Sequence, residues 1–109
     1  MSLDIRITRS RKTSCPYCGE MIGYKEIECV DSGGRAWYEP LESLGYYVPY
    51  EERTKENDWY SKDMVITKEQ AMQIRNFVGC FNVYNCEQIS DLIAAAILDG
   101  DDVVINADW

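Results

Sequence analysis

Hydrophobic and polar residues alternate at the start of the chain. Leu3, Ile5 and Ile7 occupy every second position, with polar residues between them. Because successive side chains of a strand point to opposite faces of a sheet, this period of two predicts a strand that is buried on one face. Residues 102–107 predict a second strand close to the other end of the chain. We expect these first and last strands to pair.

The middle of the chain has weaker patterns. Residues 20–30 predict one or two short strands, broken near Gly23, and residues 31–34 predict a turn. Residues 40–45 predict a short helix, with proline in its first turn and glycine just past its end. Residues 46–62 are polar and aromatic without a clear period, so they are expected to form an extended loop.

Two amphipathic helices are predicted after this loop. Thr67 and Gln70 fit the capping-box pattern at the start of the first, and Asn85 begins the second, with Gln88 three residues later. The apolar positions of both recur at helical spacing. In the first helix they are Ala71, Ile74, Phe77 and Val78. In the second they are Ile89, Leu92, Ile93, Ala96 and Ile97. Gly100 is expected to end the second helix.

Strands at both ends with two adjacent helices before the last strand predict an α+β fold. We expect a small mixed or antiparallel sheet, with a hairpin near the N-terminus and two C-terminal helices followed by a last strand. A chain of 109 residues with 46% hydrophobic residues fits one domain, residues 1–109, around one modest core.

Several function classes are disfavoured by the composition. Histidine is absent, which removes the commonest general base near neutral pH. Phosphate-binding loops and the glycine-flanked nucleophile of hydrolases are also absent from the sequence, so we do not expect an enzyme. The longest apolar run, residues 92–98, is shorter than the roughly 18 residues of a membrane span. The first twelve residues lack the apolar region of a secretory signal, so a cytoplasmic protein is expected.

Charge is distributed unevenly along the chain. The net charge of −8 argues against nucleic-acid binding by a broad basic face. The basic residues of the first twelve positions are Arg6, Arg9, Arg11 and Lys12. Arg75 is the last basic residue of the chain. The acidic residues after it are Glu87, Asp91, Asp99, Asp101, Asp102 and Asp108. We favour a basic first strand beside an acidic last strand over an acidic partner-binding face, because cross-strand charge pairs are common in sheets.

Cys15 and Cys18 form a Cys-Pro-Tyr-Cys motif that two chemistries share. In a glutaredoxin-like dithiol enzyme the motif lies where a strand meets a helix, whose N-terminus stabilises the reactive thiolate. In a zinc knuckle the two thiolates lie on a tight turn, and glycine after the second cysteine permits it. Here Gly19 follows Cys18, and the next residues show no helical stripe. The turn is therefore favoured over the redox site.

A second, incomplete knuckle follows at residues 29–33, where Cys29 is followed by Ser32 in the second cysteine's place. The segment from Cys15 to Gly33 thus resembles a degenerate zinc ribbon. The resemblance implies a structural zinc site with Cys15, Cys18, Cys29 and Asp31 as ligands. The fourth position is left open between Asp31, Cys80, Cys86 and no ligand at all. A metal-free relic of the ribbon remains the alternative to Zn²⁺.

The segment from Trp37 to Tyr60 is rich in aromatic and acidic residues. Aromatic side chains are enriched in binding hot spots, because they bury much area with few rotatable bonds. The competing interpretation is that they anchor a long loop to the core. As candidate partner-binding residues we take Tyr46, Tyr47, Tyr50, Trp59 and Tyr60.

Together these patterns favour a small acidic accessory protein that acts by contact with another protein, of the kind that phages and other mobile elements encode. One form of this hypothesis is a nucleic-acid mimic, which requires carboxylates to gather on one face. The alternatives are a thiol–disulfide oxidoreductase that uses Cys15 and Cys18, and a nucleic-acid-binding zinc ribbon. Neither a nucleic-acid partner nor a membrane is expected.

Overall fold

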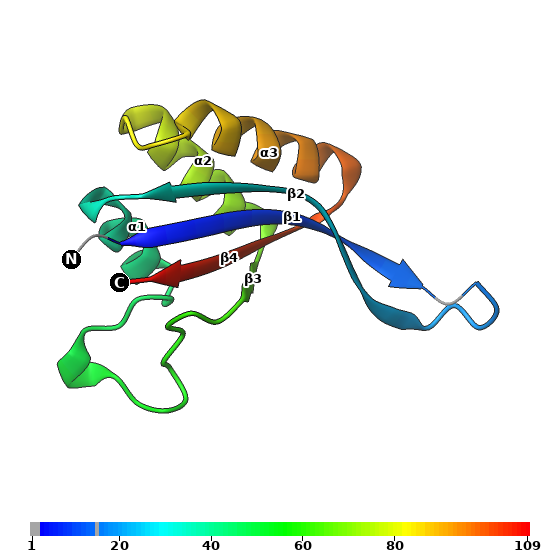
Figure 1. Cartoon of the computed structure of the whole chain (residues 1–109), viewed down its shortest axis with the longest axis horizontal. Helices are drawn as coiled ribbons and strands as arrows, with labels where there is room; N and C mark the ends of the chain where they lie inside the picture. Colours follow the sequence, from blue (N-terminus) through cyan, green and yellow to red (C-terminus); the bar gives the residue numbers. More distant parts are fainter. Residues whose placement is uncertain (1–2, 15) are drawn as a thin grey trace.

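A computed structural model describes residues 3–14 and 16–109, apart from the side chains of Met21 and Ile22. Four strands form one antiparallel sheet in the order β2-β1-β4-β3, and α2 and α3 pack on one of its faces (Figure 1). The predicted α+β class is confirmed. The elements along the chain are β1 (Asp4–Ser14), β2 (Met21–Gly33), the short 3-10 helix Arg35–Trp37, α1 (Tyr38–Ser43), the 3-10 helix Tyr50–Glu52, β3 (Met64–Ile66), α2 (Lys68–Cys80), α3 (Cys86–Asp99) and β4 (Asp102–Asp108).

The first and last strands lie side by side at the centre of the sheet, as predicted. Ile7 of β1 is opposite Ile105 of β4, and both side chains are fully buried. Alternate residues of each strand face the helices: Leu3, Ile5 and Ile7 before and in β1, and Val103, Ile105 and Ala107 in β4. Burying each large aliphatic side chain contributes roughly 1.5–3 kcal/mol, so this face holds the helices to the sheet.

The two long helices begin and end near the predicted positions. In α2 the Thr67 hydroxyl accepts a hydrogen bond from the Gln70 amide, and the Gln70 side chain accepts one from the Thr67 amide. The predicted capping box is therefore present. α3 ends at Gly100, which has the left-handed backbone that glycine tolerates. Asn85 departs from expectation, because its side chain donates to the Asp31 carbonyl oxygen at 2.8 Å instead of capping α3.

β2 runs unbroken for 13 residues, so the predicted interruption near Gly23 is wrong. Gly23 pairs with Thr13 of β1, and the Thr13 hydroxyl donates to the Gly23 carbonyl oxygen at 3.0 Å. Two register shifts, after Arg9 and after Thr13 of β1, accommodate extra residues of β2 as bulges. Pairing with β1 therefore overrides the local weakness that glycine introduces.

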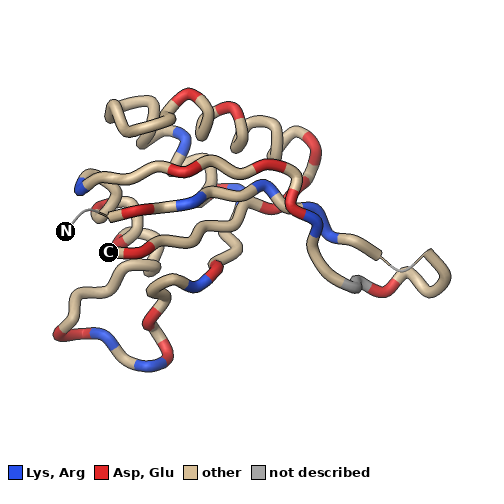
Figure 2. The backbone as a smooth tube through the Cα atoms, in the orientation of Figure 1, with Lys and Arg blue, Asp and Glu red and all other residues tan. Residues whose placement is uncertain are grey.

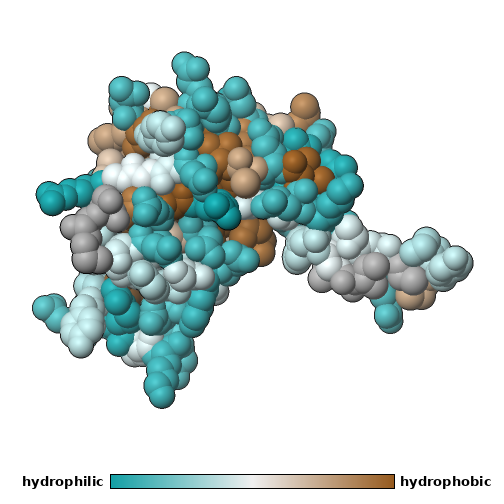
Figure 3. All heavy atoms as spheres, in the orientation of Figure 1, coloured by the Kyte–Doolittle hydropathy of each residue, from teal (hydrophilic) through white to brown (hydrophobic). Residues whose placement is uncertain are grey.

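The hairpin of β1 and β2 extends beyond the rest of the sheet. β1 pairs with β4 only as far as Ser10, and beyond it pairs with β2 alone. We call residues 11–14 and 16–25 the arm. Figures 1 and 3 show the arm projecting to the right of the body, and the molecule measures 47 × 34 × 21 Å along its principal axes.

Candidate interaction surface

The face of the sheet opposite α2 and α3 carries the other half of the strand residues. In β1 these are Asp4, Arg6 and Thr8, each next to a buried neighbour on the covered face. Their partners across the sheet follow from the register. We call this set the open face: Asp4, Arg6, Thr8, Ser10, Tyr24, Glu26, Cys29, Asp31, Asp63, Val65, Val104, Asn106 and Asp108.

One row of uncharged residues crosses all four strands of the open face. Cys29 of β2 is opposite Thr8 of β1, Thr8 is opposite Val104 of β4, and Val104 is opposite Val65 of β3. Val65 is 52% exposed. We call these four residues the neutral row. It offers aliphatic surface that contributes nothing to the core below.

Polar side chains flank the neutral row on its Asp4 side. The Arg6 guanidinium donates to the Asp31 carboxylate at 2.9 Å, and the Asn106 amide donates to the Asp63 carboxylate at 2.9 Å. One register step further, Asp4 of β1 lies opposite Asp108 of β4. This end of the open face is therefore acidic, with Arg6 already paired.

The open face is hollowed rather than flat. A broad depression of about 880 Å³ spans it, and its lining includes five carboxylates and one guanidinium. Those charged residues are Asp4, Arg6, Glu26, Asp31, Asp63 and Asp108. A concave surface with an aliphatic centre and a charged margin has the organisation of protein-binding surfaces, in which an apolar centre is surrounded by a polar rim.

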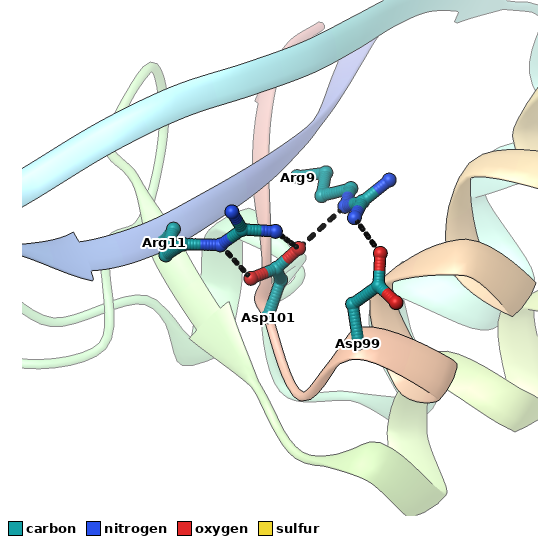
Figure 4. Close-up of polar contacts among 4 residues, drawn as sticks. All are labelled: Arg9, Arg11, Asp99 and Asp101. Carbon is teal, nitrogen blue, oxygen red and sulfur yellow. Dashed lines mark hydrogen bonds and ion pairs between the residues drawn. The ribbon is translucent and has the colours of Figure 1, made fainter.

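The basic residues of β1 pair with carboxylates, as the sequence predicts. Figure 4 shows the Arg9 and Arg11 guanidinium groups converging on Asp101, with Nε–O distances of 2.6 and 2.7 Å, while Arg9 also contacts Asp99. The hydrogen bond from Arg11 is the largest cause of a pKa of about 2 for the Asp101 carboxyl. Burial opposes it, and the hydrogen bond from Arg9 and the charges of both guanidinium groups lower the pKa further. This cluster joins β1 to the turn between α3 and β4.

Lys12 lies 4.0 Å from Asp102, so all four basic residues of the first twelve positions have an acidic neighbour. Figure 2 shows the corresponding blue and red segments together along β1 and its neighbours. A nucleic-acid-binding ribbon requires these cations to face phosphates. Here the four cations pair with carboxylates of the protein itself, so the structure does not favour a nucleic-acid-binding ribbon.

Cys18 lies in the turn of the hairpin, with an exposed thiol at the tip of the arm. Gly19 after it has φ +74°, in the left-handed region that the knuckle requires of this position. The predicted hairpin flanks the motif, with a strand on either side and no helix after Cys18. Cys18 therefore lacks the helix N-terminus that a glutaredoxin-like thiol uses. Cys15, the other residue of the motif, lies outside the described residues.

The remaining ligands of the hypothetical zinc ribbon lie elsewhere. Cys29 is opposite Thr8, six register positions from Ser14 at the end of β1, which corresponds to about 20 Å along the strand. Thiolates that share one zinc ion lie within about 4 Å of each other. Cys18, Cys29 and Asp31 therefore do not fit one ion in this structure, since residues 29–33 continue the strand and form no second turn. Among the described residues, no group of three or more metal-binding side chains is found.

Ser32 has a structural role that accounts for a serine at this position. Its buried hydroxyl accepts a hydrogen bond from the Trp37 indole at 3.1 Å and donates one to the Tyr84 carbonyl oxygen at 2.6 Å. It thereby joins β2 to the turn before α3. Cys80 and Cys86, the other candidate ligands, lie at the facing ends of α2 and α3, far from the arm (Figure 1). The Cys80 side chain is exposed and that of Cys86 is partly buried.

The aromatic residues proposed to bind a partner differ in how far they are exposed. Tyr46 is fully buried, so its assignment as a binding residue is wrong. Its hydroxyl donates to the Lys62 carbonyl oxygen and accepts from the Ala107 amide, both at 2.7 Å, and burial raises the pKa of this hydroxyl. Trp59 stacks on Tyr46 and Tyr47 is partly buried, while Tyr50 is 85% exposed.

Trp109 organises this region, although sequence reasoning missed it. The rings of Tyr46, Tyr47 and Tyr60 contact it edge-on at centroid distances of 5.1–5.9 Å, and the Arg53 guanidinium lies 5.4 Å from its ring centre. A tryptophan at the end of a predicted strand is the signal that could have indicated an anchor. The anchoring interpretation of the loop aromatics therefore holds for most of the segment.

Comparisons of the chain with protein-family models, curated proteins and solved structures gave no match. In the described part of the chain, none of the helices has the length and apolar character needed to cross a membrane.

Proposed function

We propose that this protein is a small acidic accessory protein, not an enzyme, that acts by contact with another protein through its open face. The observation that carries this proposal is the hollowed sheet face, crossed by the neutral row and bordered by carboxylates. The covered face already supplies the hydrophobic core. The residues of the open face are therefore not needed for the core and can serve to bind a partner protein.

The knuckle and the loop support this role indirectly. The knuckle turn closes the hairpin, so its contribution is structural under this proposal, with or without a metal. The aromatic residues around Trp109 fix the loop beside the end of β4, where Asp108 borders the open face. The small size and acidity of the chain suit an accessory protein of a mobile element, such as a phage-encoded inhibitor.

Site-specific photocrosslinking tests the proposal. A photoreactive phenylalanine analogue replaces Val65 in one preparation, and Leu98, which is 86% exposed on α3, in the matched control. In an extract of the source cells, Val65 is expected to crosslink to one protein species. Unlabelled wild-type protein should suppress this crosslink, and a Val65→Arg competitor should not.

Two results would contradict the proposal. The first is equal crosslinking from positions 65 and 98, which would indicate contact without a preferred face. The second is the absence of any competed crosslink from position 65.

A further inference from the structure

We infer that the partner of the open face presents an extended basic segment, with an arginine or lysine above Asp4 and Asp108. This inference rests on the proposed function and specifies the chemistry of the partner. The segment would lie along β1 and β4, in the hollow of the open face.

The pair of carboxylates at Asp4 and Asp108 is the starting point. These residues are direct partners in the β1–β4 ladder, and both are exposed. Residues directly opposite in antiparallel strands have Cβ atoms about 4.5–5.5 Å apart, and like charges there are destabilising. Within the described residues, neither carboxylate has a lysine or arginine at ion-pair distance; Asp108 instead accepts a hydrogen bond from the Ser61 hydroxyl.

The neighbouring strand leaves room beside this pair. Gly33 is opposite Asp4 on its other side, and a Cβ atom at Gly33 would lie 2.6 Å from the Leu3 carbonyl oxygen. A side chain is therefore sterically excluded at position 33, so the residue of β2 directly opposite Asp4 carries none. A cation from a partner can approach the two carboxylates there and offset their mutual repulsion.

Register gives the spacing that the partner needs. The neutral row lies four residues from Asp4 along β1, or about 13 Å, which is also the length of four residues of an extended segment. Glu26 borders the row on its other side, opposite Ser10, two residues beyond Thr8. In the partner segment, an aliphatic residue would lie over Val104. One basic residue, four positions away on one side, would lie over Asp4 and Asp108, and a second, two positions away on the other side, would face Glu26. The segment can run in either direction along the strands.

The probe is a short synthetic peptide with one valine and two arginines at these spacings. Binding is measured by titration calorimetry, and the contact surface by NMR chemical-shift changes. We compare wild type with Asp4→Asn/Asp108→Asn and with the charge-matched control Glu87→Gln/Asp91→Asn, which changes exposed residues of α3. We expect the first variant to bind roughly tenfold more weakly, because a charged partner is lost, and the control to bind within about twofold of wild type.

The shifts should fall on β1, β4 and β3, and thermal unfolding should show the open-face variant folded. Equal weakening in both variants would overturn the inference, because binding would then follow total charge alone. Unchanged affinity of the open-face variant, or no binding of the peptide to wild type, would overturn it as well. A competed Val65 crosslink to a partner without such a basic segment would reject this inference and leave the proposed function standing.

Discussion

The two faces of the central sheet place opposite demands on neighbouring residues. Ile105 of β4 is fully buried against the helices, while Val104 beside it lies on the open face opposite Thr8. Both are β-branched aliphatic residues in the same strand, so strand propensity does not distinguish them. The comparison shows that one strand can carry stability on one side and leave the other side for recognition.

The largest expected effect comes from truncating the covered face. Ile105→Ala removes buried methyl groups and leaves a cavity, and should lower the free energy of unfolding by about 2–5 kcal/mol. Val104→Ala should cost less than about 1 kcal/mol, because surface substitutions have small effects. Urea denaturation of both variants measures the difference. Similar losses would show that the open face is also part of the core.

A second substitution compares Ser32 with Asp31, which are adjacent in β2 but lie on opposite faces. Ser32→Ala leaves the buried Trp37 indole without its acceptor and should lower the free energy of unfolding by about 1–3 kcal/mol. Asp31→Asn breaks an exposed ion pair with Arg6 and should cost about 0–1 kcal/mol. The reverse order, measured by denaturant unfolding, would contradict the role assigned to the Ser32 hydroxyl.

The ion-pair cluster predicts a pH dependence of stability. The pKa of the Asp101 carboxyl is about 2 in the folded protein, below its ordinary value of 3.8. The folded state therefore favours the ionised carboxylate, and the contribution of Asp101 is fully present above pH 3.8 and is lost as the pH falls toward 2. The unfolding free energy of Asp101→Asn should change less steeply over this interval than that of wild type. Parallel profiles would show that Asp101 is not responsible.

The smallest expected effect is a gain in stability. Asp4→Asn removes one of two like charges that face each other across β1 and β4, and should raise the free energy of unfolding by about 0.2–1 kcal/mol at low salt. Added salt should shrink the gain, since exposed charges are screened. Thermal unfolding at two salt concentrations measures it. A loss of stability would show that Asp4 makes a favourable contact within the chain.

Sequence patterns succeeded where the determinant is local. The alternation from Leu3 to Ile7, the capping box at Thr67 and the helix end at Gly100 each depend on a few neighbouring residues. The pairing of basic β1 residues with acidic ones near β4 could also be predicted, because the two strands were expected to be neighbours.

The sequence misled where a distant partner decides the outcome. Residues 29–33 match most of the knuckle motif, yet they pair with β1 as a strand, and Ser32 bonds the Trp37 indole. Tyr46 is of a residue type that is common in binding sites, but in the folded protein its hydroxyl bonds the Ala107 amide and its ring packs on Trp109. The open face itself has no local signature, because it arises only when β3 and β2 complete the sheet around β1 and β4.

The arm also has a consequence for how cooperatively the molecule unfolds. Among the described residues its strands form backbone pairs only with each other, and side-chain ion pairs from Arg11 and Lys12 reach the body only at its base. An isolated two-stranded hairpin is marginally stable in water. The backbone amide hydrogens of the arm should therefore exchange with solvent through local opening, while those of β4 should exchange only through global unfolding. Oxidation of the exposed Cys18 thiol at the tip of the arm, or binding to it, should consequently leave the folding equilibrium of the body unchanged.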